Sequence, residues 1–420
     1  MYERENREKQ RVIFTKEMKK THKILIPNML PIHFELLKNI MINEGYDCEL
    51  LKYEGEEVIK EGLKNTHNDM CYPCLLVVGQ FIYALKSKKY DINKTALLIT
   101  QTGGGCRASN YIHILRKALK KAGFEKVPVI SVNLSGLENN PGFKLNIPLI
   151  KKLASALLYG DMITYLYNQT KPYEIEKGSC EKIKNIWIDK LSKQYINSTG
   201  FGKKIISKNF DEIASSFTKI KTKKIKKIKV GIVGEIYVKY SATANNNLEN
   251  FLYEENVEIV SPGILNFIIF KVDNRIVDIE LYGGNKIKKF LCLKFKEYLE
   301  SLQKIFIETI KKYKKFSVPN SFEEIKKSVL EYISYGVKMG EGWLLTAEIL
   351  DLINEGVKNV ICVQPFGCLP NHIAGKGMVR KIINNNSNVN IVTIDYDPGA
   401  TKINQENRIK LMLASAKENL

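Results

Sequence analysis

Three cysteines of this chain lie where an apolar, strand-like run breaks into a loop and a helix-like pattern begins. They are Cys71 in His-Asn-Asp-Met-Cys-Tyr-Pro-Cys, Cys106 in Thr-Gly-Gly-Gly-Cys-Arg and Cys368 in Gln-Pro-Phe-Gly-Cys-Leu-Pro-Asn-His. Backbone N–H groups at a helix N-terminus stabilise an anionic thiolate and inorganic sulfide. Three loops of one type, far apart in the sequence, would need a fold that gathers them at one edge of a sheet. The pattern favours an iron–sulfur cluster with these cysteines as its ligands.

Apolar runs alternate with helix-patterned stretches along the chain, which indicates parallel βαβ units. A mostly helical stretch at 148–217 separates two such series, and a second helical part occupies 286–356. The expected strands are 23–27, 48–51, 96–100 and 127–132 in the first series, and 229–233, 257–260, 357–363 and 390–395 in the second.

We therefore predict an α/β protein with two flavodoxin-like or Rossmann-like parallel-sheet domains and additional helical segments. The domains are expected at 1–150 and 226–420, with a helical connecting segment at 151–225 and a helical insertion at about 286–355. Ligands of open parallel sheets bind off the carboxyl ends of the strands. The cysteine loops are thus expected to face one cleft between the domains.

The composition indicates folded domains, and the distribution of charge bears on whether nucleic acid is a partner. The chain has 420 residues, of which 44% are hydrophobic, and a formal net charge of +20. Lysine supplies most of this charge and is dispersed, the densest run being 221–229. Such a run is typical of a solvated linker or helix face, so nucleic acid is not expected as a partner.

The N-terminal segment 1–10 is charged and lacks the apolar region of a signal peptide. No apolar stretch is long enough to span a bilayer. We therefore predict a cytoplasmic protein without membrane contact, in which the cysteines are reduced, metal-bound or inert rather than paired in disulfides.

Two motifs have rival interpretations. The Cys71-Tyr-Pro-Cys74 spacing fits a thiol–disulfide motif and a metal site about equally well in isolation, and the other cysteine loops favour metal. Zinc sites usually present paired Cys-x-x-Cys knuckles, and one such pair is present, so iron–sulfur is favoured over zinc. The glycines at 103–105 could cradle a phosphate, but the Lys-Ser/Thr pair of a P-loop is missing.

The other cysteines are expected to have packing or bystander roles. Cys362 lies in a strand-like run and is expected in the core, because free cysteine is often fully buried. Cys48 and Cys292 fall in apolar patterned segments and are expected to pack, whereas Cys180 has no metal-like neighbours.

Several motif-like strings are spread along nearly the whole chain. They are Cys-Tyr-Pro at 71–73, Leu-Val-Val-Gly-Gln at 76–80, Ile-Thr-Gln-Thr-Gly-Gly-Gly-Cys-Arg-Ala-Ser-Asn at 99–110, Asn-Asn-Pro-Gly-Phe at 139–143, Val-Gly-Ile-Val-Gly-Glu-Ile at 230–236, Gly-Glu-Gly-Trp at 340–343, Gln-Pro-Phe-Gly-Cys-Leu-Pro-Asn-His at 364–372 and Ile-Asp-Tyr-Asp-Pro-Gly at 394–399. These strings resemble those of 2-hydroxyacyl-CoA dehydratase component proteins (2-hydroxyglutaryl-CoA dehydratase D-component-like). The likeness is greatest to the branch related to large activase-fused proteins.

This resemblance implies a [4Fe–4S] cluster bound by Cys71, Cys106 and Cys368, with one iron open to a substrate oxygen or another sulfide. It also implies a separate ATP-hydrolysing activator that donates a low-potential electron, so that a ketyl radical forms and hydroxide leaves an acyl-CoA substrate. No ATPase segment is visible in this sequence, so the activator is expected to be another polypeptide. His372 and Arg107 are expected nearest the reacting atoms as proton or hydrogen-bond donors, or equally as braces of the ligand loops.

Two alternatives remain open. A double-cubane iron–sulfur reductase of small substrates would need more thiolates, for which Cys74 and Cys362 are the candidates. A noncatalytic electron-transfer or assembly partner would use its basic surface to dock acidic proteins. The protein could act as a homodimer or as part of a heterodimer.

Overall fold

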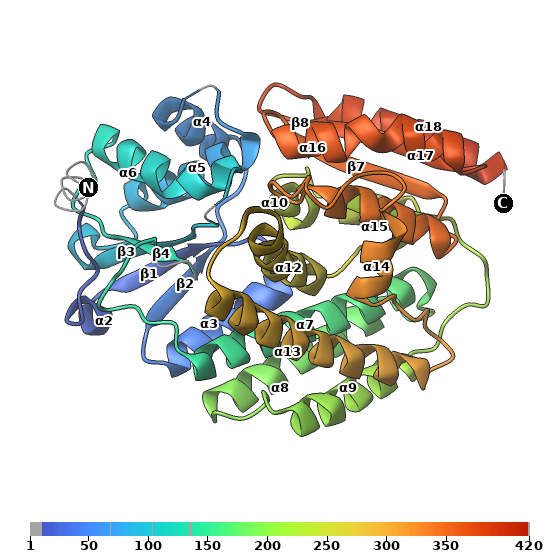
Figure 1. Ribbon diagram of the computed structural model, residues 1–420, viewed down its shortest axis with the longest axis horizontal. Coiled ribbons are helices and arrows are strands. Elements are labelled where there is room, and N and C mark those ends of the chain that lie inside the picture. Colours follow the sequence, from blue (N-terminus) through green and yellow to red (C-terminus); the bar gives the residue numbers. More distant parts are fainter. Residues whose placement is uncertain (1–10, 68, 103, 134–136, 419–420) are drawn as a thin grey trace. The chain divides into compact units, whose positions relative to one another are not determined.

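The computed structural model describes residues 11–67, 69–102, 104–133 and 137–418. The chain divides into two compact units, Met1–Ile150 and Lys151–Leu420. Each unit has one four-stranded sheet in which every strand pair is parallel, with helices packed on it (Figure 1). The predicted α/β class with two parallel sheets is confirmed.

The first sheet has the strand order β2-β1-β3-β4. The chain goes from β1 outward to β2 and then returns to β3 on the other side of β1, so the topological switch point lies between β1 and β3. Helices α4, α5 and α6 cover one face of this sheet and α3 covers the other (Figure 1). The strands are β1 (Lys23–Pro27), β2 (Asp47–Leu51), β3 (Thr95–Thr100) and β4 (Val129–Val132), and the α-helices are α2 (Met18–Thr21), α3 (Pro31–Asn43), α4 (Glu56–Asn65), α5 (Tyr72–Lys86) and α6 (Tyr111–Lys121).

The second sheet has the order β6-β5-β7-β8, which places its switch point between β5 and β7. Helix α15 packs so closely on β5 that a Cβ atom at Gly231 would lie 2.6 Å from Leu352 Cδ1. The strands are β5 (Lys229–Gly234), β6 (Glu258–Val260), β7 (Asn359–Pro365) and β8 (Asn390–Tyr396).

Helices make up most of the second unit, and α7 begins at the end of the first. They are α7 (Ile147–Thr170), α8 (Ser179–Ile196), α9 (Lys203–Thr218), α10 (Ile236–Tyr240), α11 (Leu248–Glu254), α12 (Ile264–Tyr282), α13 (Lys286–Lys311), α14 (Phe322–Ser328), α15 (Trp343–Asn354), α16 (Leu369–Ala374), α17 (Val379–Asn385) and α18 (Lys402–Glu418). The lysine-rich segment 221–228 has no helix and is mostly exposed, as predicted. Among the described residues, no helix has both the length and the apolar character needed to cross a membrane.

Candidate functional site

Cys71 is the N-cap of α5, and Pro73 lies in the first turn of that helix. Proline is favoured there because its φ is already helical and a first-turn N–H has no helical partner in any case. Helix α5 leads back to the start of β3 and so runs antiparallel to the strands, which puts its N-terminus at the carboxyl edge of the sheet. The Cys71 side chain is buried at this edge, beside the first-turn N–H groups that stabilise a thiolate.

Cys106 follows β3 at the same edge and is the N-cap of the short 3-10 helix η2 (Arg107–Asn110). Its side chain is half-buried. The Ser109 hydroxyl closes the glycine-rich loop, because it accepts a hydrogen bond from Gly104 N at 2.7 Å and donates to Gly104 O at 2.8 Å. These two bonds link Gly104 to the 3-10 helix that Cys106 caps.

Two contacts tie the Cys71 and Cys106 loops together. The Arg107 guanidinium donates a hydrogen bond to the Asp69 carbonyl oxygen, and the Cys71 thiol and the Tyr111 hydroxyl share a hydrogen bond of 2.8 Å. Asp69 precedes Cys71 by two positions and Arg107 directly follows Cys106, so these two predicted ligands lie in neighbouring loops. The Arg107 contact is that of a brace, one of the two roles expected for it.

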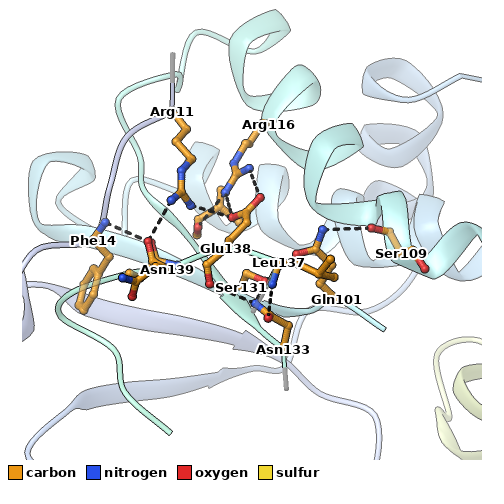
Figure 2. A network of polar contacts seen from close by, with 12 residues as sticks. Arg11, Phe14, Gln101, Ser109, Arg116, Ser131, Asn133, Leu137, Glu138 and Asn139 are labelled. Atoms are coloured by element: carbon orange, nitrogen blue, oxygen red, sulfur yellow. Dashed lines mark hydrogen bonds and ion pairs between the residues drawn. The ribbon is translucent and has the colours of Figure 1, made fainter. Parts of the chain in front are cut away.

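A polar network shown in Figure 2 supports this end of the first sheet. Glu138 accepts hydrogen bonds from both terminal nitrogens of Arg116 at 2.7 Å and from Arg11 at 2.9 Å. Burial alone would raise the pKa of Glu138, but the hydrogen bonds and charge of Arg116 hold that pKa below its ordinary value. In the same view Gln101, directly after β3, donates to the Ser109 carbonyl oxygen at 3.4 Å. The network fixes the segment that leads to Cys106.

Cys368 lies in the second unit, after β7, and is the N-cap of α16. The turn before it needs Gly367, whose φ of +74° is in the left-handed region that favours glycine. Phe366 N donates to Tyr396 O at 2.8 Å, which holds the turn against the end of β8. The Cys368 side chain is buried at the carboxyl edge of the second sheet.

His372 braces the Cys368 loop. Its Nδ1–H donates to the Cys368 carbonyl oxygen at 2.8 Å, which leaves Nε2 as a hydrogen-bond acceptor. The Gln364 amide nitrogen lies 2.9 Å from this Nε2 and 2.7 Å from Asp395 Oδ1, so its two hydrogens serve both acceptors. Both ring nitrogens have protein partners in this arrangement, and proton donation to a substrate by His372 stays a prediction.

The two candidate extra thiolates have surroundings unlike those of the three loop cysteines. Cys74 and Cys362 are both fully buried. Burial raises the pKa of the Cys74 thiol well above its ordinary value, and burial together with the nearby Asp395 raises that of Cys362 to about 12. Cys362 also donates a long hydrogen bond to Asn371 Oδ1 at 3.8 Å. These environments stabilise neutral thiols and favour packing roles.

Among the remaining cysteines, Cys48 is buried as predicted, and burial raises its pKa to about 12. Cys292, which is expected to pack like Cys48, is not buried; it is half-buried, as Cys106 is. It lies on α13 beside the exposed side chains of Phe290 and Leu291. No side chain at 286–294 is buried, so the apolar pattern there does not mark a core-facing stripe.

The structure adds a buried carboxyl pair at the switch point of the second sheet. Glu235 directly follows β5 and accepts a hydrogen bond from Val238 N at 2.9 Å, while Glu341 accepts from Ile236 N at 3.1 Å. Burial and the charge of Glu341 raise the pKa of Glu235 to about 8. The pair therefore holds a proton at neutral pH. Glu235 lies in the string 230–236 and Glu341 in the string 340–343, but nothing in the sequence indicates that the two glutamates are close in space.

The predicted ligands are divided between the units, with Cys71 and Cys106 in the first and Cys368 in the second. Across the part of the chain that the structure describes, no group of three or more His, Cys, Asp or Glu side chains is arranged to hold a metal ion. Each of the three cysteines nevertheless has, within its own unit, the placement at a helix N-terminus that suits a thiolate ligand.

Comparison of the sequence with protein-family models gave no matching family, and a search of curated proteins gave no match.

Proposed function

We propose that this chain is an iron–sulfur protein of the 2-hydroxyacyl-CoA dehydratase type, with Cys71, Cys106 and Cys368 as the ligands of a [4Fe–4S] cluster. The supporting observation is that each of these cysteines is a helix N-cap at the carboxyl edge of a parallel sheet. When bound by three thiolates, such a cluster would supply a low-potential electron and an iron with an open position.

The surrounding residues have roles that fit this proposal. The Tyr111 hydroxyl can donate to a Cys71 thiolate, and Arg107 and His372 orient the ligand loops. Hydrogen bonds of this kind fix metal ligands and tune the metal. The Glu235–Glu341 pair can give or take a proton near neutral pH.

The proposal includes the partners and the compartment. A separate ATP-hydrolysing activator would donate the electron, an acyl-CoA would be the substrate, and the chain would act as a homodimer or within a heterodimer. The proposal includes a cytoplasmic location, because thiols stay reduced in that compartment and can serve as metal ligands.

Iron and acid-labile sulfide analysis of the intact chain, purified or reconstituted without oxygen, tests the cofactor. We expect about four irons and about four sulfides per chain, as in a single cubane. About eight of each would support the double-cubane reductase instead. Zinc without sulfide, or bare thiols after reconstitution, would contradict the proposal.

Two cysteine variants test the ligand assignment. Cys106→Ser should lose most of the cluster, because a neutral hydroxyl is a poor replacement for a thiolate. Cys292→Ser is the control, since Cys292 lies on the exposed start of α13 and should keep full visible absorption. Equal loss or equal retention in the two variants would show that the ligands are misassigned.

A further inference from the structure

The second unit has a cavity of about 200 Å³ along the edge strand β6. It opens at the amino-terminal ends of β5 and β7, the sheet edge opposite to that of Cys368. This volume is below the ~300 Å³ at the lower end for drug-sized ligands, so any occupant is small. The polar part of its wall consists of Tyr165, Asn168 and Gln169 from α7, Lys229 from β5, Glu258 from β6, Ser261 after β6, Ser317 and Glu355 after α15.

The single lysine in this wall is already neutralised. Lys229 Nζ lies 3.3 Å from Glu258 Oε1, and the other oxygen of Glu258 accepts a hydrogen bond from the Tyr173 hydroxyl at 2.6 Å. The Lys229–Glu258 pair therefore leaves no strong charge for a ligand to meet on that side of the cavity.

Glu355, which also lines the cavity, is different. No lysine or arginine of the described residues forms an ion pair with it, and Asp351, one helical turn earlier, also lacks one. The chain has 65 Lys and Arg residues against 45 Asp and Glu residues, so cations are not scarce. Burial and the charge of Asp351 raise the pKa of Glu355 to about 7, although a backbone hydrogen bond at Asn320 and the more distant charge of Lys229 oppose this rise. A cation placed in the cavity would offset both effects.

Asn168 offers a second contact. Its side chain is 4% exposed, and its Oδ1 accepts a hydrogen bond from the Tyr253 hydroxyl at 2.8 Å. Its amide nitrogen donates to no other described residue, although Asn168 lines the cavity. This nitrogen is not cut off from solvent, so it can donate to an oxygen of a molecule in the cavity.

We propose that this cavity binds a small aliphatic amine that also carries a hydroxyl or carbonyl oxygen, with its ammonium group against Glu355 and its oxygen accepting from Asn168. A bare divalent metal ion fits less well, because the described residues provide no group of three metal-binding side chains. Within the second unit the site lies at the other sheet edge from Cys368, so the inference goes beyond the proposed cluster function and does not depend on it.

Isothermal titration calorimetry of the full chain tests the site with three probes of similar length. The first, 4-amino-1-butanol, has both groups, while butylamine lacks the oxygen and 1,4-butanediol lacks the ammonium. We expect 4-amino-1-butanol to bind best, butylamine to bind several-fold more weakly, and 1,4-butanediol to give no binding heat. Equal heats for the diol and the amines, or binding of Mg²⁺ in their place, would overturn the proposal.

Two variants locate the site. Glu355→Gln should weaken 4-amino-1-butanol binding at least tenfold, whereas Glu308→Gln, an exposed substitution on α13, should leave it unchanged. Asn168→Ala should remove the advantage of 4-amino-1-butanol over butylamine without abolishing amine binding. Circular dichroism of each variant verifies folding. Unchanged binding in folded Glu355→Gln would overturn the assignment, whatever the iron content of the protein.

Discussion

At the scale of single residues, the surroundings of each sulfur atom determine its chemistry more than the sequence motif does. Cys71 and Cys74 belong to one Cys-x-x-Cys motif, yet they differ in environment. Cys71 caps α5 and contacts the Tyr111 hydroxyl, whereas Cys74 is fully buried within α5 and its pKa is raised. The first environment suits a thiolate and the second a neutral thiol. A metal-ligand role is therefore better supported for Cys71.

The Tyr111 contact gives a prediction for the reduction potential. Tyr111→Phe removes a hydrogen-bond donor from Cys71 but leaves the thiol in place. Because hydrogen bonds to cluster sulfur stabilise the reduced, more negative state, the variant should retain iron and sulfide while its reduction potential falls. Anaerobic redox titration measures this. An unchanged potential would show that the hydroxyl does not donate to a cluster ligand.

The raised pKa of Glu235 gives a prediction for stability against pH. The pKa of Glu235 is about 8 in the folded chain, against an ordinary value of 4.5. Its contribution to stability is thus present below about pH 4.5 and is lost as the pH rises through 8. Glu235→Gln can keep the bond from Val238 N without ionising. The free energy of unfolding of the variant, compared with that of the natural chain, should therefore increase as the pH rises from 5 to 9. The increase should be on the order of a few kcal/mol.

Thermal unfolding of both proteins at the two pH values measures this difference. The exposed substitution Glu308→Gln is the control and should show no such pH dependence. A Glu235→Gln difference that is the same at both pH values would mean that Glu235 is already ionised in the folded chain.

At the scale of elements, apolar runs between turn residues were enough to predict the strands, because inner strands of a parallel sheet are buried on both faces. Helix boundaries were harder to predict, because the chain between β7 and β8 forms two helices, α16 and α17, that are separated at Gly375. Gly375 has non-helical dihedral angles there, and a Cβ atom at this position would lie 2.6 Å from Asn371 Oδ1. The Asn371 side chain is held by a hydrogen bond that it donates to Val363 O of β7, and the pattern of apolar residues along the helix does not reveal such a contact between elements.

In the candidate site, too, local features could be predicted from the sequence and contacts between distant residues could not. Pro73 and Pro370 mark the helix starts after Cys71 and Cys368, so the capping positions could be predicted from local sequence. The Cys71–Tyr111 contact joins residues 40 positions apart. The distance between such residues is set by how α5 and α6 pack, and a single sequence does not contain that information.

The packing of α4 on α5 gives a prediction at this scale. A Cβ atom at Gly79 would lie 2.0 Å from the Val58 carbonyl oxygen, so the two helices touch through backbone atoms. Gly79→Ala should destabilise the protein by about 1–3 kcal/mol through overpacking, although alanine is the better helix former. Gly202→Ala is the control, because its Cβ would meet nothing within 4 Å. Circular dichroism during heating measures the unfolding temperature of each variant. Equal unfolding temperatures for the two variants would contradict this packing.

At the scale of the whole molecule, each unit has its own parallel sheet, switch point and cysteine loop region. The first unit contributes Cys71 and Cys106 and the second contributes Cys368. The amine cavity lies wholly in the second unit, at the other edge of the sheet from Cys368. Within the second unit, Cys368 and the proposed amine site therefore lie at opposite edges of one sheet, so a bound amine need not contact Cys368.

The last prediction concerns the energy source of the proposed reaction. The described loop after β3 is closed by Ser109 and leads to Cys106, without the Lys-Ser/Thr pair that a phosphate-binding loop would need. We therefore expect that the cluster-loaded chain does not dehydrate 2-hydroxyacyl-CoA thioesters with dithionite alone. Turnover should begin when a separate cluster-bearing ATPase and ATP are added, because ATP hydrolysis then drives the electron to low potential.

Anaerobic assays of acyl-CoA products with and without the ATPase measure this dependence. Cys106→Ser should remain inactive with the ATPase present, and Cys292→Ser should be as active as the natural chain. Rapid dehydration by the isolated chain without ATP would contradict the requirement for a partner. Inactivity of a fully loaded chain with every component present would count against the dehydratase reaction itself, while leaving the cysteine assignment to the iron and sulfide analysis.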